Sequence, residues 1–220
     1  PAADASPHIK NDSGKSSTSS ISHTLTFDNR DNRFSPNRGY VISTTNELAG
    51  LGGSKRYLRN QVSAGVYYSI YPEFVISALG QAGHIIGIGQ DIGVNERFNL
   101  GGDSFRGFAT AGMGPRDVNT NDALGGNAFG VGTVELSFPL GLPDEFALKG
   151  RVFAEAGSVF GLDKKNLVGV ADDTSLRASL GVGTSWESPF GPIRVDLAFP
   201  LLRETYDEKQ LFHFSFGRRF

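Results

Sequence analysis

Apolar and polar residues alternate along most of this 220-residue chain, which predicts β-strands and leaves little room for helices. Most of the alternating segments contain the roughly 9–11 residues, or more, that a tilted strand needs to cross a membrane. No run of about 18 apolar residues occurs, so a transmembrane helix is excluded. Nine segments carry the two-residue period: 21–29, 39–50, 55–71, 73–88, 127–139, 147–160, 177–187, 192–200 and 211–220.

The composition of the two strand faces separates two all-β architectures. In the last segment Phe212, Phe214 and Phe216 lie on one face, opposite His213 and Ser215. A soluble sandwich buries such an apolar face between two sheets, whereas a membrane barrel turns it toward lipid and keeps a polar lumen. Both architectures fit the alternation. The polar faces are rich in Gly, Ser, Arg, Asp and Glu, and aromatic residues gather near strand ends as in a membrane girdle. We therefore favour an antiparallel transmembrane β-barrel.

The connections between the segments alternate in length. Short turns such as Tyr71–Glu73 and Ser188–Gly191 alternate with longer connections such as 89–124, and Leu51–Ser54 breaks the pattern. Short turns in the periplasm and long loops outside the cell are typical of outer-membrane barrels. We therefore expect Phe220 on the periplasmic side and the loop 89–124 to start from the extracellular side.

The overall composition argues against several functions. A formal net charge of −2 does not suit a nucleic-acid surface, which requires a concentrated basic face. The chain has no Cys, and its four His residues share no ligand spacing, so we expect no metal site. No nucleophile and base stand in a recognisable arrangement. The sequence thus predicts no catalytic residue, no cofactor and no enzyme activity.

One loop carries an unusual group of residues, Phe105-Arg106-Gly107-Phe108. Glu135 and Glu155 lie on the polar faces of the two segments that follow the loop. An Arg that enters the lumen can bridge two carboxylates through charge-assisted, bidentate hydrogen bonds. The alternative is that all three are separate lumen charges solvated by water, and spacing alone favours that alternative.

This group and other stretches resemble the BamA/TamA superfamily of outer-membrane assembly proteins. Phe105–Phe108 is similar to the Arg-Gly-Phe/Tyr loop motif of that family. The resemblance extends from about residue 21 to residue 220. Its further stretches are Arg97–Phe108, Asp28–Gly39, Leu48–Gly53, Gly125–Asn127, Val152–Gly161 and Ser188–Val195.

The resemblance implies a domain organisation. Family barrels have more strands than nine and are preceded by periplasmic POTRA repeats. We therefore expect residues 21–220 to be the C-terminal part of an outer-membrane β-barrel of the bacterial surface antigen type. Residues 1–20 are then the remnant of an extracellular loop, and 89–124 is a long loop that folds inward.

The resemblance also implies a function and a mechanism. Similar proteins fold and insert β-barrel proteins into the outer membrane of Gram-negative bacteria. The implied partners are unfolded outer-membrane barrel proteins, assembly-complex lipoproteins, the lipid bilayer and lipopolysaccharide, and no nucleic acid. In the family the loop Arg contacts acidic residues on neighbouring strands, which by position are Glu155 and Glu135, although the family usually has Asp where Glu155 stands.

The last strand would form one side of an incompletely closed seam that accepts a client strand. Gly217 would let that strand, which ends at Phe220, bend. We expect Arg106 to hold the loop inside and support the barrel wall opposite this seam. Two other functions stay open: a polypeptide-secreting pore of the same superfamily and a passive channel.

Overall fold

The computed structural model describes residues 4–143, 146–163, 169–188 and 191–216. In these ranges one sheet contains nine strands, and neighbouring strands are antiparallel. In spatial order they are β1 Thr18–Asp28, β2 Gly39–Gly53, β3 Tyr57–Tyr71, β4 Phe74–Gly87, β7 Ala128–Pro139, β8 Leu148–Phe160, β10 Arg177–Ser188, β11 Gly191–Leu202 and β13 Phe212–Phe216. Each corresponds to one predicted segment, so the all-β antiparallel prediction is confirmed.

The remaining elements are short. They are α1 Pro7–Asn11, η1 Val94–Glu96, η2 Gly102–Ser104, β5 Gly107–Phe108, β6 Arg116–Asp117, β9 Val170–Ala171 and β12 Lys209–Gln210. Two pairs of these strands form separate small sheets, β5 with β12 and β6 with β9. Among the residues placed by the structure, no helix is both long and apolar enough to span a bilayer.

The predicted start of the first strand is too late. Residues 18–20 were expected to lie in a loop because they are polar and lack alternation, yet they belong to β1. Thr18 is opposite Gly53 and Ser20 is opposite Ala49, with an irregularity in between. Backbone pairing with β2 therefore extends the strand beyond the point where the side-chain pattern ends.

The burial of the strand residues is inverted relative to a soluble protein. On β8, Arg151 and Glu155 are 3% and 2% exposed, whereas Val152 between them is 39% exposed. On β13, His213 is 4% exposed and its neighbour Phe214 is 60% exposed. Soluble proteins almost never bury charged side chains while they expose a continuous apolar face. The outer face is therefore suited to lipid and the inner face to a polar lumen.

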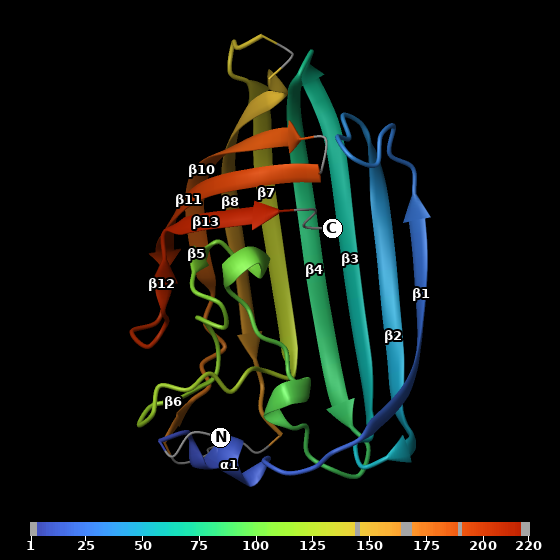
Figure 1. Cartoon of the computed structure of the whole chain (residues 1–220), viewed down its shortest axis with the longest axis vertical. Helices are drawn as coiled ribbons and strands as arrows, with labels where there is room; N and C mark the ends of the chain where they lie inside the picture. Colours follow the sequence, from blue (N-terminus) through green and yellow to red (C-terminus); the bar gives the residue numbers. More distant parts are fainter. Residues whose placement is uncertain (1–3, 144–145, 164–168, 189–190, 217–220) are drawn as a thin grey trace.

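The inner side of the sheet is occupied by the connection between β4 and β7. Figure 1 shows the sheet as a curved wall, with this connection (green) inside the curve. Its apolar residues form a core with the wall: Leu100, Phe105, Phe108 and Met113 cluster with Phe129 and Val159. The long connections leave from the end of the wall opposite the tight β3–β4 turn, as the predicted asymmetry requires.

Candidate functional site

Two rings anchor the motif loop inside the wall. Phe105 and Phe108 are fully buried, and their ring centroids lie 5.4 Å apart in an edge-to-face arrangement. Gly107 between them has φ +95°, a backbone conformation that residues other than glycine rarely adopt. A Cβ at this position would lie 3.1 Å from the Cβ of Ser179 on β10. Glycine therefore lets the backbone turn and approach the wall between the two anchors.

Arg106 is held by carboxylates from the wall. Its Nε and Nη2 atoms donate to Glu155 Oε1 at 2.9 and 2.7 Å, and its backbone N–H donates to Glu155 Oε2 at 2.7 Å. Nη1 donates to Glu135 Oε2 at 3.1 Å. The guanidinium carbon also lies 3.2 Å from the ring centroid of Phe153, which is buried on the same strand as Glu155. The structure thus brings Arg106, Glu135 and Glu155 together in a largely buried site.

Two further residues, which were not predicted from the sequence, belong to this cluster. Asp196 on β11 accepts from Arg106 Nη1 at 3.4 Å and from Arg151 Nη2 at 2.5 Å. Arg151 on β8 also donates to Glu135 at 3.2 Å. Both residues lie on the polar faces of their predicted strands, and this position indicated that they face the lumen. Only the strand register shows which of the many lumen charges meet.

The motif reaches the C-terminal strand, contrary to the expectation that it supports the wall opposite the seam. The N–H of Gly107 donates to Nε2 of His213 on β13 at 2.8 Å. Asp196, which bonds to Arg106, is the register partner of His213. The curvature of the sheet brings β11 and β13 back to the loop, which strand order alone did not reveal. Gly217 and Phe220 lie outside the described residues.

The connection between β11 and β13 is also bound to the loop and to β10. β12 pairs with β5, and the Glu208 side chain accepts from Arg116 Nη1 at 2.6 Å. On the other side, Arg177 donates to both oxygens of Asp207, at 3.0 and 3.2 Å, and both side chains are fully buried. Burial raises the pKa of the adjacent Tyr206 to about 12, although the Arg177 guanidinium opposes this shift.

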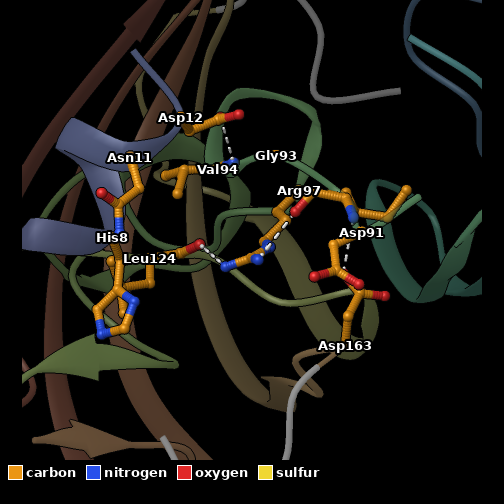
Figure 2. A pocket seen from close by; sticks show the side chains of 10 residues that line it. His8, Asn11, Asp12, Asp91, Gly93, Val94, Arg97, Leu124 and Asp163 are labelled. Atoms are coloured by element: carbon orange, nitrogen blue, oxygen red, sulfur yellow. Dashed lines mark hydrogen bonds between the residues drawn. The ribbon is translucent and has the colours of Figure 1, made fainter.

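A polar cavity of about 330 Å³ lies at the end where the long connections gather. Figure 2 shows its lining, to which α1 and the segment after β4 contribute. Two of its charged groups bond within the protein: Asp12 accepts from Val94 N at 2.9 Å, and Arg97 donates to the Ile92 carbonyl at 2.8 Å. Burial lowers the pKa of Arg97. No group of three or more His, Cys, Asp or Glu able to hold a metal occurs in the described part of the chain.

Comparison with known proteins gives consistent results. Residues 1–220 match the Omp85 superfamily domain. The chain is 40% identical over 214 residues to the "Outer membrane protein assembly factor BamA" of Neorickettsia risticii, which covers 96% of this chain and 29% of that protein. It is 30% identical to the protein of the same name from Nitratidesulfovibrio vulgaris, covering 99% of this chain and 27% of the relative. The chain thus spans less than a third of the length of these relatives.

A further relative and a solved structure extend the comparison. The human "Sorting and assembly machinery component 50 homolog" is 33% identical over 139 residues, which is 62% of this chain and 29% of that protein. A crystal structure of BamA from Haemophilus ducreyi lacking POTRA domains 1–3 superposes with a TM-score of 0.77 at 25% identity. It matches 89% of this chain and 41% of the other. The predicted outer-membrane β-barrel fold is therefore confirmed.

Proposed function

The chain belongs to the Omp85 superfamily, and from this premise we propose that it is part of a protein that folds and inserts β-barrel proteins into the outer membrane of a Gram-negative bacterium. The observation that carries the proposal is the 40% identity, over nearly the whole chain, to a protein named as an outer-membrane protein assembly factor. The resemblance expected from the motifs is confirmed by this membership. The proposed role in assembly is not enzymatic.

The proposed mechanism uses the edge of the sheet. β13 is the last strand of the described sheet, and β11 is its neighbour there. A strand with one free edge has backbone N–H and C=O groups that a client strand can pair with. An unfolded outer-membrane barrel protein would add its strand there. The bend at Gly217 and the end of the strand at Phe220 remain part of this proposal.

The motif loop would keep the wall in shape while the edge is used. Arg106 connects three strands through Glu135 on β7, Glu155 on β8 and Asp196 on β11. Because the loop and its apolar anchors fill the inner side of the wall, an assembly factor is favoured over a passive channel. We further propose that the sheet from β1 onward forms the C-terminal part of the barrel, with the residues before Thr18 coming from an extracellular loop. Assembly-complex lipoproteins and lipopolysaccharide are the remaining proposed partners.

The test replaces Arg106 by Glu in the full-length protein, in cells depleted of the wild type. A fourth carboxylate would then face Glu135, Glu155 and Asp196, and like charges repel more strongly at a buried site than in water. We expect a loss of folded outer-membrane barrels, measured by their heat-modifiable migration on gels. Arg203→Glu, the same charge reversal on an exposed side chain, is the matched control. Normal assembly by the Arg106→Glu protein would refute the proposed role of the loop.

A further inference from the structure

A second polar cavity, of about 90 Å³, lies at the end of the wall where the short turns are. Its roof is part of the connection from β1 to β2, residues 34–37, which lies at the same end as the β3–β4 turn (Figure 1). Its walls come from β3, β4, β7, β8, β10 and β11. It shares no lining residue with the cavity at the opposite end. A cavity of this volume has room for several water molecules and therefore for a small polar group.

The roof is held in place by hydrogen bonds. Asp31 Oδ1 accepts from the backbone N–H groups of Asn37 and Arg38 at 3.0 and 3.2 Å. Lys149 on β8 donates from Nζ to Oγ of Ser35 at 3.2 Å, which joins the roof to the wall. The cavity is therefore preformed by bonds within the protein.

One guanidinium group in this cavity is not used by the protein. The Nε atom of Arg194 on β11 is buried and has no hydrogen-bond partner among the described residues. Two other inward arginines of the wall differ, because Arg151 binds Asp196 at 2.5 Å and Arg177 binds Asp207 at 3.0 Å. Buried polar groups are nearly always hydrogen-bonded, so an exception calls for an explanation.

The carboxylates that attract Arg194 are already bound to other guanidinium groups. They belong to Glu135 and Asp196. Glu135 accepts from Arg106 at 3.1 Å and from Arg151 at 3.2 Å. Asp196 accepts from the same two arginines at 3.4 and 2.5 Å. The donors of Arg194 therefore remain available to a group from outside the wall.

Small residues leave room beside Arg194. Its register partners are Ser185 on β10 and Ser215 on β13. Both side chains are short, and the hydroxyl group of Ser185, which also lines the cavity, can donate a hydrogen bond. A ligand that accepts from Arg194 could thus also accept from Ser185.

The charges that line the cavity favour a ligand with one negative charge. Three cationic side chains, Lys149, Arg151 and Arg194, face two carboxylates, Glu135 and Glu187, which leaves one positive charge in excess. The two oxygens of a carboxylate match the planar guanidinium fork. A phosphate group carries up to about two negative charges, so a carboxylate suits the site better.

We propose that this cavity binds a carboxylate of an unfolded client protein, with Arg194 as the main binding residue. The choice of ligand rests on the proposed function, because the short-turn end faces the periplasm, from which a client would arrive. The carboxylate belongs either to an acidic side chain or to the C-terminus of the client. A client bound there is held beside β11, the neighbour of the edge strand β13.

The test measures the binding of dye-labelled peptides to the full-length protein in detergent micelles, where both ends of the lumen are accessible, by fluorescence anisotropy. Three short peptides share one neutral sequence: the first has a free C-terminal carboxylate, the second is amidated, and the third is amidated and contains a single Glu. We expect at least one carboxylate peptide to bind about tenfold more tightly than the neutral amide, as for a charge-assisted hydrogen bond. The peptide that binds identifies the source of the carboxylate.

Three variants assign this preference to the cavity. Arg194→Gln should abolish it, whereas Arg203→Gln, the same charge change on an exposed side chain, should retain it. Ser185→Asp places a carboxylate opposite Arg194 in the register, where it pairs with the guanidinium and should also abolish the preference. Because this variant leaves no charge unpaired, it decides should Arg194→Gln fail to fold.

The proposal is overturned if the wild type does not distinguish the peptides, if Arg194→Gln or Ser185→Asp retains the preference, or if Arg203→Gln loses it as well. Peptide binding does not depend on client assembly. Loss of folded barrels in cells with Arg106→Glu, together with no peptide preference in the wild type, would therefore refute this site and leave the proposed function standing.

Discussion

Replacing Arg106 by Met tests how the loop is held, because Met keeps the bulk of the side chain and removes its charge. Glu155 then loses the donors on Nε and Nη2, and keeps the backbone N–H of residue 106 and a 3.4 Å contact from Thr133. Glu135 and Asp196 each retain Arg151 as a partner. The perturbation therefore falls mainly on one carboxylate.

The expected magnitude follows from the burial of that carboxylate. The side chain of Glu155 is 0% exposed and that of Arg106 is 4% exposed. Removing one partner of a buried ion pair costs about 3–5 kcal/mol, because the remaining charge is left buried without its counter-charge. At about 1.4 kcal/mol per factor of ten, the opening of the loop should become roughly two to three and a half orders of magnitude more favourable.

The assay is hydrogen–deuterium exchange of the loop in vesicles at neutral pH, which reports the free energy of local opening. The double variant Arg106→Met with Glu155→Gln removes the stranded charge and should recover at least half of the lost protection. Phe105 and Phe108 remain as apolar anchors in both proteins. A loss of less than tenfold in the single variant, or strict additivity in the double variant, would refute the reasoning.

Two further predictions concern the backbone and pH. Gly107→Ala places a Cβ on a residue with φ +95°, 3.1 Å from a side chain of β10, so it should destabilise the packed loop by about 1–3 kcal/mol. The control Gly130→Ala should be neutral, because a Cβ there would have no atom within 4 Å. Equal protection of the loop from hydrogen exchange in the two variants would contradict this prediction. Hydrogen bonds from the backbone of Arg38, and further ones from that of Asn37 and Asn32, lower the pKa of Asp31 below its ordinary 3.8. The turn that contains Asp31 should therefore be fully stable above pH 3.8 and should open as the pH falls through the lowered pKa of Asp31. Hydrogen exchange of the amides in this turn, measured between about pH 5 and pH 2.5, checks the prediction. The Asp31→Asn variant should show no pH-dependent opening. A wild-type turn that stays closed over the whole range would contradict the prediction.

The strands were predictable because their signal is local. A period of two requires only that one face of each strand meets lipid and the other meets the lumen, so Val152 and Glu155 reveal their sides without knowledge of their neighbours. The start of β1 was misplaced because Thr18 and Ser20 are polar on both faces and are held by backbone pairing. Where apolar and polar side chains do not alternate, the sequence does not show where a strand begins.

The motif was recognisable in sequence, whereas its complete surroundings were not. Glu135 and Glu155 were identifiable because they follow the loop on inward faces and match the family in position. Asp196 and His213 are distant in sequence, and many other polar residues share their faces. Nothing in a single strand says which of these residues meets the loop.

The sequence by itself determined the number of strands, their inward and outward faces and the loop that carries Arg106, because these depend on local alternation and on a recognisable motif. The tertiary structure decided that β11 and β13 curve back to that loop, that Arg106 bonds to Asp196, and that His213 meets Gly107. These contacts depend on the register and curvature of the whole sheet. Both arise from the summed pairing and twist of many strands rather than from any one segment.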